Sequence, residues 1–444
     1  MPISAYIMIK TTSETKNGMM RIHTVKTDKY KMSRFSINFI TKSDKINTPL
    51  SKLMLSVMLR GSEKYPTVTS INKALDEQYG TAVSFGSSSV GDKTVHKISC
   101  KLINDRFLLD GDDTDILENV MAIVSDILLH PLTDEKGSLL SQFVESEKRI
   151  AIDHINAKIN DPKSYASEQC SKYMFESSKY SVVADGDEEL ISSFTPEMLT
   201  ENIKSFFASS RIEFFYVGNK SNGEIKTLVE KYFPIGGDCS NAIDYSESAF
   251  ESKKKDVRYI EDVADVSQGR LVLGYRCNTV LSDPDRYAMS LFNEIFGGGS
   301  VSKLFMNVRE KKSLCYYCYS SYHTSTGTIK VGCGIDPTKK DEALEEIALQ
   351  LDEMKCGNIT GGEIETAKNT LCSGIKQVSD TPASIEAFAL RRMLANVSEE
   401  PDNCIKEIRA VTKEQIIAAA NKVELDTVYF LTGSGEYEED ECDE

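Results

Sequence analysis

The sequence has little positive charge and no long apolar run. Lys and Arg number 52 against 68 Asp and Glu, so the formal net charge is −16. A nucleic-acid-binding protein would carry a basic footprint instead, so this class is not expected. No apolar stretch approaches the roughly 20 residues that span a bilayer, and residues 1–19 lack the pattern of a signal peptide. We therefore expect neither a membrane span nor a nucleic-acid partner.

A disulfide framework is also missing. The 11 cysteines are odd in number and scattered along the chain. Together with the missing signal peptide, this favours reduced thiols in a cytoplasmic protein. Cys315 and Cys318 form a Cys-x-x-Cys pair, but they fall in a predicted strand, where their side chains would point to opposite faces. We therefore expect neither a redox nor a zinc function from this pair.

A repeated unit organises the chain. A length of 444 residues predicts two or three domains of roughly 150–200 residues each. Residues 195–219 contain an amphipathic helix followed by an apolar strand, and residues 412–435 repeat that order at nearly the same length. A short acidic helix precedes each segment, at 187–193 and 404–409. The two halves of the chain are therefore predicted to be homologous.

The repeat extends upstream of these segments. In both halves the pattern predicts an apolar helix, a second helix, two strands and two long amphipathic helices, in that order. The predicted ranges are 50–61, 67–79, 81–89, 94–102, 114–130 and 134–158 in the first half, and 285–296, 301–312, 314–321, 327–334, 339–355 and 361–378 in the second.

These elements predict an α+β fold with two homologous domains. Each domain would be a largely antiparallel sheet with helices packed on one face. We place the N-terminal domain at 1–235, a polar linker at 236–255, and the C-terminal domain at 256–444, including an acidic tail at 436–444. Two facing domains would leave a cleft between them, which is a common place for ligands.

Several motifs resemble one enzyme family. The second domain carries Phe296-Gly-Gly-Gly-Ser-Val-Ser-Lys-Leu-Phe305 and then Val308-Arg-Glu-Lys-Lys-Ser-Leu-Cys-Tyr316. The first carries Met58-Leu-Arg-Gly-Ser-Glu-Lys-Tyr-Pro66, Glu147-Lys-Arg-Ile-Ala-Ile-Asp-His-Ile155 and Asp161-Pro162. In order and spacing these motifs resemble the pitrilysin/insulinase family of metallopeptidases over nearly the whole chain. The chain looks most like the bacterial members without the zinc motif, and the resemblance implies that its two domains form half of a clamshell.

The resemblance also identifies what is missing. Active family members carry H-x-x-E-H on a helix, where two His bind zinc and the Glu is the general base. Alignment on Arg60-Gly61-Ser62 puts Lys52 and Ser56 at the His positions and Leu55 at the Glu position. The distant third ligand falls on His154, seven residues after Glu147. No H-x-x-E-H occurs at any of the five His, so we expect no metal and no catalytic residue in this chain.

The second domain keeps its family residues. The resemblance places Arg309 and Tyr316 where active assemblies hold an Arg/Tyr pair, whose guanidinium and phenol can bind a peptide carbonyl and its developing oxyanion. The alternative is a structural ion pair for Arg309 and packing on the sheet for Tyr316. Gly297, Gly298 and Gly299 lack the Gly-Lys-Ser/Thr ending of a phosphate loop, so we expect a sharp turn that could also touch extended peptide.

Three functions are compatible with these features. The first is a non-catalytic subunit of a heterodimeric peptidase, whose partner carries H-x-x-E-H and the zinc, with a peptide or small protein as substrate. The second is a peptide-binding or scaffold protein without any peptidase role. The third is an enzyme with an unconventional acid–base site built from Lys52, Glu147 and His154. The first explains why the first-domain ligands are lost while the second-domain motif is kept.

Overall fold

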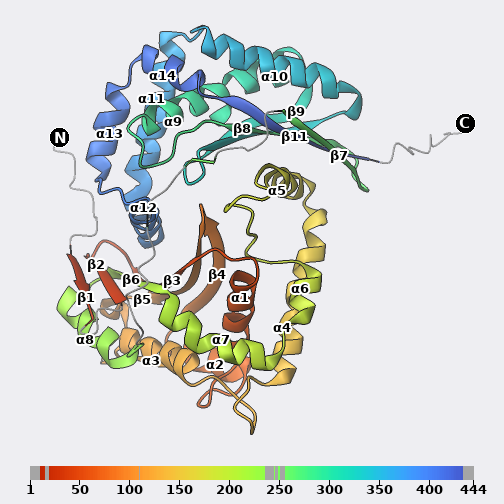
Figure 1. The fold of residues 1–444 in the computed structure, drawn as a ribbon. Coiled ribbons are helices and arrows are strands. Elements are labelled where there is room, and N and C mark those ends of the chain that lie inside the picture. The colour runs from red at the N-terminus through yellow and green to blue at the C-terminus, as the bar shows by residue number, and fades with distance from the viewer. Residues whose placement is uncertain are drawn as a thin grey trace, which may run out of the picture. The chain divides into compact units, whose positions relative to one another are not determined.

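The protein is described here by a computed structural model, which covers residues 11–15, 20–109, 111–235, 245, 249–250 and 256–433. The chain divides into two compact units (Figure 1). Unit 1 comprises 1–156, 182–245 and 377–394, and unit 2 comprises 157–181, 246–376 and 395–444. Most of the predicted linker at 236–255 and the whole acidic tail at 436–444 lie outside the described residues.

Unit 1 is built on a six-stranded sheet in the order β1-β2-β6-β3-β5-β4. Its neighbouring strands are antiparallel except for the parallel pair β2 and β6. The strands are β1 (Thr11–Glu14), β2 (Met20–Lys26), β3 (Met32–Lys42), β4 (Ala82–Val90), β5 (Lys93–Ile103) and β6 (Arg211–Gly218).

Unit 2 repeats the same topology. Its sheet has the order β7-β11-β8-β10-β9, with β7 and β11 parallel and the other pairs antiparallel. The strands are β7 (Arg258–Val263), β8 (Gly269–Arg276), β9 (Cys315–His323), β10 (Thr328–Ile335) and β11 (Glu424–Thr432). This order corresponds, strand by strand, to the order β2-β6-β3-β5-β4 in unit 1. The correspondence confirms the predicted repeat.

Helices of each unit pack over its sheet and against one another. In unit 1 they are α1 (Asn47–Met58), α2 (Val68–Asp76), α3 (Ile116–Leu129), α4 (Ser141–Ala157), α6 (Glu188–Ser193), α7 (Pro196–Ser209) and α8 (Asn222–Tyr232). In unit 2 they are α9 (Arg286–Asn293), α10 (Lys340–Lys355), α11 (Gly361–Lys376), α13 (Pro401–Ala410) and α14 (Lys413–Ala420), with two π-helical segments, η4 (Glu294–Gly298) and η5 (Leu304–Lys311).

The repeated helices start from equivalent signals. Thr195 caps α7 by accepting the backbone N–H of Met198, and Thr412 caps α14 by accepting that of Gln415. A threonine hydroxyl at this position satisfies one of the N–H groups that a helix leaves unpaired at its start. The same local chemistry therefore starts the helix that precedes β6 in unit 1 and β11 in unit 2.

Each sheet is also covered on its other face by a helix from the opposite half of the sequence. Helix α12 (Pro382–Leu394) buries Leu390 and Leu394 with Ile40 and Phe215 in unit 1. Helix α5 (Pro162–Met174) buries Cys170 and neighbouring residues on β8 and β11 in unit 2 (Figure 1). The predicted α+β fold of two largely antiparallel sheets with packed helices is confirmed, and these exchanged helices add a layer that the repeat pattern does not reveal.

A buried carboxylate anchors α12 to the sheet of unit 1. Glu386 is 1% exposed. It accepts hydrogen bonds from Arg34 Nε at 2.9 Å and Ser36 Oγ at 2.6 Å, and its Oε1 lies 2.6 Å from Lys97 Nζ. Burial alone would raise the pKa of Glu386, but Lys97, Ser36 and Arg34 together lower it. The carboxylate therefore stays ionised inside the unit and holds the exchanged helix in register.

The helices do not provide a bilayer-crossing segment. Across the described ranges, none combines the length and apolar character that such a crossing needs.

Candidate functional site

The residues at the family's zinc positions gather around one pocket in unit 1. Lys52 and Ser56 lie on α1, and Glu147 and His154 lie on α4. All four line a pocket of about 170 Å³. Glu147 and His154 are seven residues apart, so they share a helix face as expected. The rest of the lining is largely apolar, contributed by residues such as Leu53, Ile150 and Ile191.

The charged groups of this pocket are paired with residues that the zinc motif does not include. The Lys52 ammonium donates a hydrogen bond to Asp185, which also lines the pocket. Arg60 Nε lies 3.0 Å from Glu147 Oε1. Burial raises the pKa of Glu147, and Arg60 opposes that rise. Asp185 lies in a loop between α5 and α6, so no periodic or motif signal could identify it from the sequence.

Leu55, at the general-base position, is absent from this lining. Its side chain is fully buried in the core of unit 1, where it packs among residues such as Met54 and Met58. It therefore belongs to the fold rather than to the pocket.

These residues do not fit the zinc ion of the family. An ammonium already paired with a carboxylate repels a cation, and a serine hydroxyl is a poor zinc ligand. Zinc sites use Cys, His and carboxylate donors, with three protein ligands plus water at catalytic sites. An acid–base site built from Lys52, Glu147 and His154 is not favoured either. Lys52 is ion-paired with Asp185, and Glu147 is ion-paired with Arg60.

The second group of predicted residues lies in unit 2. Arg309 is near the end of η5, and its guanidinium lies over the ring of Phe305 at 4.7 Å and 3.7 Å from Glu310 Oε1. Its side chain remains 40% exposed. Tyr316 follows on β9, which packs against η5, and is 60% exposed. Tyr316 therefore does not pack on the sheet. Its exposed phenol and the partly exposed guanidinium of Arg309 lie on adjacent elements.

Gly297 and Gly298 end the π-helical segment η4 and do not form the expected sharp turn, which begins at Gly299. A Cβ added at Gly297 would lie 2.6 Å from the backbone nitrogen of Ser320 and 2.7 Å from its Oγ. Only a residue without a side chain lets η4 approach β9 so closely. Gly297 is thus needed for packing, while Gly298 is exposed.

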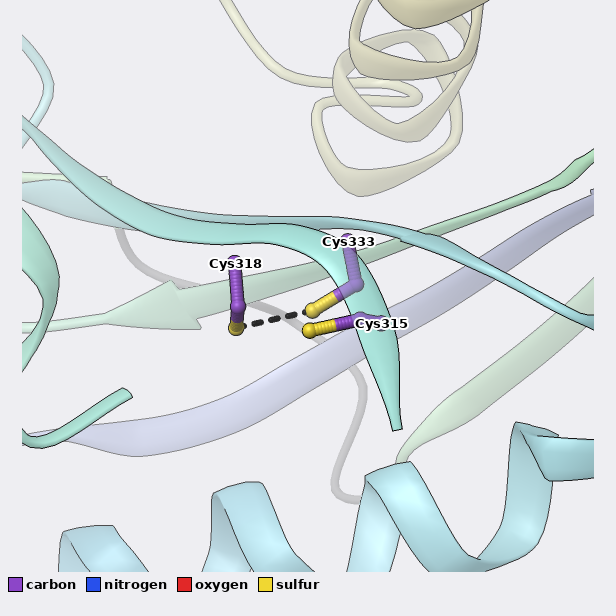
Figure 2. A group of neighbouring side chains, drawn as sticks. All are labelled: Cys315, Cys318 and Cys333. Carbon is purple, nitrogen blue, oxygen red and sulfur yellow. Dashed lines mark hydrogen bonds between the residues drawn. The ribbon is translucent and has the colours of Figure 1, made fainter. Parts of the chain in front are cut away.

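Cys315 and Cys318 lie on the same face of the sheet, contrary to the expectation from strand alternation. The register between β9 and β10 pairs Cys318 with Cys333 and Tyr317 with Gly334, but then pairs Cys315 with Ile335. Tyr316 is the extra residue of a β-bulge, and one extra residue reverses the alternation of side chains. The three sulfur atoms of Cys315, Cys318 and Cys333 consequently lie within 4.8 Å of one another (Figure 2).

The three thiols also influence one another's ionisation. The neighbouring Cys318 and Cys333 lower the pKa of Cys315, with a further contribution from Arg309 and against the effect of burial. The pKa of Cys318 is raised by Cys315, and that of Cys333 is raised by burial. The bulge thus creates a thiol cluster beside Arg309 that the sequence spacing alone does not predict.

Comparisons with known proteins agree with these features. Residues 193–371 match the family model described as "Peptidase M16 inactive domain". The "Probable inactive metalloprotease YmfF" of Bacillus subtilis is 30% identical over 421 residues, which are 95% of this chain and 97% of that relative. The "Uncharacterized zinc protease YmxG" of the same bacterium is 23% identical over 305 residues, 68% of this chain and 71% of the relative.

The fold is likewise similar to that of solved structures. A conserved protein from Enterococcus faecalis superposes with a TM-score of 0.86 at 25% identity, and the match covers 94% of this chain and 97% of that one. Both units of the chain are therefore included in the likeness.

Proposed function

This chain belongs to the M16 (pitrilysin/insulinase) peptidase family, and from that premise we propose that it is a non-catalytic subunit that pairs with a zinc-bearing family member. The partner would supply H-x-x-E-H and the zinc ion. This chain would supply Arg309, Tyr316 and part of the wall of a chamber in which a peptide is processed. It would bind no catalytic zinc of its own.

The observation that carries the proposal is the contrast between the two units. In unit 1 the zinc positions are occupied by an ion-paired Lys52, a core Leu55 and Ser56. In unit 2 the family residues remain accessible, with the Tyr316 ring in solvent. The exposed phenol and guanidinium on adjacent elements support a role in holding a peptide.

The exposed residues have chemistry that suits a peptide. A guanidinium and a phenol donate hydrogen bonds to a carbonyl oxygen and bind the oxyanion more tightly as charge develops on it. Among the strands that the structure describes, β9 lies at an edge of its sheet, where an extended peptide could add as a further strand.

Replacing Arg309 by alanine should lower the kcat of the assembled pair by about 100-fold, the typical cost of removing one oxyanion donor. Gel filtration should still recover the pair, because the guanidinium of Arg309 contacts only its near neighbours Phe305 and Glu310 among the contacts described here for it. The measurement is hydrolysis of a fluorogenic peptide. Lys311→Ala, which removes an exposed cation from the same segment, is the matched control and should leave kcat unchanged. Equal activity of Arg309→Ala and wild type would contradict the assigned role.

The alternative is a peptide-binding or scaffold protein with no peptidase role. Gentle purification from native cells followed by mass spectrometry separates the two. A one-to-one companion with H-x-x-E-H is the result expected from the proposal. Recovery of the chain alone, or with a protein unrelated to the family, would instead favour the scaffold function.

A further inference from the structure

We propose that Cys315, Cys318 and Cys333 form a binding site for a single thiophilic divalent metal ion of the Zn²⁺ class. The site lies in unit 2, whereas the family's zinc positions lie in unit 1. It needs no zinc in a partner, and it adjoins Arg309 and Tyr316 without using either as a ligand.

The geometry of the sulfur atoms fits such an ion. Zn–S bonds of about 2.3 Å at tetrahedral angles place thiolate sulfurs roughly 3.8 Å apart. All three sulfur atoms already lie within 4.8 Å of one another, and those of Cys318 and Cys333 are 2.8 Å apart. Side-chain rotations that open the latter pair by about 1 Å would complete a three-thiolate face. Figure 2 shows the three side chains converging from two adjacent strands.

The grouping of three cysteines distinguishes this cluster from the other buried cysteines of the described chain. Other free cysteines, such as Cys100 and Cys372, are buried singly, as small apolar side chains are. Within the described part of the chain, this is the one group of three or more Cys, His or carboxylate side chains that meets the distances for a metal. Its convergence depends on the bulge at Tyr316, which interrupts the ladder between β9 and β10. A bulge that re-aims a side chain is typical of functional positions.

Charge and access also favour a bound cation. Three thiolates and a divalent ion carry a net charge of −1, and the neighbouring guanidinium of Arg309 offsets part of that negative charge. Cys318 and Cys333 are 4% and 1% exposed, while Cys315 is partly exposed. The ion would therefore have a sheltered sulfur face and one side open to water, the arrangement of zinc sites with three protein ligands.

The test uses the full-length chain, reduced and stripped of metal. Titration with Co²⁺ should produce thiolate-to-cobalt charge-transfer absorption that saturates at one ion per chain, and Zn²⁺ should abolish it by displacement. In Cys315→Ser, the Zn²⁺ affinity should fall by more than the roughly 10–100-fold typical of an outer-shell change. Cys318→Ser and Cys333→Ser should behave in the same way.

Cys356→Ser is the control, because Cys356 is exposed and outside the cluster; it should bind Co²⁺ as the wild type does. Circular dichroism checks the fold of each variant, and Cys315→Ser decides the result if a buried variant fails to fold. Two outcomes would overturn the proposal. The first is no charge-transfer band in the reduced wild type, including the case in which Cys318 and Cys333 only form a disulfide on oxidation. The second is a band that persists unchanged in Cys315→Ser.

Discussion

Replacing Glu386 by alanine is expected to lower the free energy of unfolding by about 3–5 kcal/mol, the usual cost of removing one partner from a buried ion pair. The variant leaves the cations of Arg34 and Lys97 facing a sheet surface without their carboxylate. It also removes the acceptor of Ser36 Oγ. The measurement is the urea midpoint of wild type and variant at neutral pH.

The pH dependence of this difference has a definite sign. The folded-state pKa of Glu386 lies below its ordinary value of 4.5, so its stabilisation is complete above that pH and is lost as the pH falls below it. The gap between wild type and Glu386→Ala should therefore shrink below about pH 4.5. Glu365→Ala removes a solvent-exposed partner of Arg409 and should cost no more than about 0.5 kcal/mol. A Glu386→Ala midpoint as close to wild type as that of Glu365→Ala would refute the anchoring role.

The second large loss of stability is expected when a glutamate is placed at position 55, where the family has its general base. Leu55→Glu is expected to destabilise unit 1 by roughly 4 kcal/mol or more, because it buries a carboxylate without a partner. The side chain at this position is fully enclosed by the apolar core. Thermal and urea unfolding measure the effect.

Leu55→Met is the matched control and should cost less than about 1.5 kcal/mol, since it keeps the volume and polarity of the site. If Leu55→Glu were as stable as Leu55→Met, the side chain at 55 would reach the pocket, which would contradict its place in the core. The expected result instead means that position 55 belongs to the apolar core of unit 1 and not to the pocket.

The sequence predicts most elements because their side-chain patterns are local. The strand expected at 81–89 is β4 at Ala82–Val90, and the helix expected at 361–378 is α11 at Gly361–Lys376. Strand β3 has no such signal, because most of its length is buried on both faces and its residues do not alternate. The helix expected at 134–158 begins only at Ser141 in α4. Asp134 accepts the N–H groups of Lys136 and Ser138 and forms a turn there instead.

The candidate site is predictable only in part, for a similar reason. Alignment identifies Lys52 and Ser56, and helix periodicity joins Glu147 to His154, because both signals are local. Asp185 reaches the pocket through a loop, and its pairing with Lys52 depends on packing between distant segments. The thiol cluster is not predictable from the sequence, because the period of two holds only for a regular strand and nothing local in the sequence marks the bulge at Tyr316.

The exchange of α5 and α12 also governs the order in which the protein can fold as it is synthesised. Unit 1 contains residues up to 245 and then lacks a layer until residues 377–394 emerge. At roughly 5–20 residues per second, that delay lasts on the order of 7–30 s. Until then, α12 is not there to cover Ile40 and Phe215. The cations of Arg34 and Lys97 also lack the carboxylate of Glu386. Unit 1 can therefore be completed only after most of unit 2 has been synthesised, and unit 2 in turn needs β11 near the end of the chain.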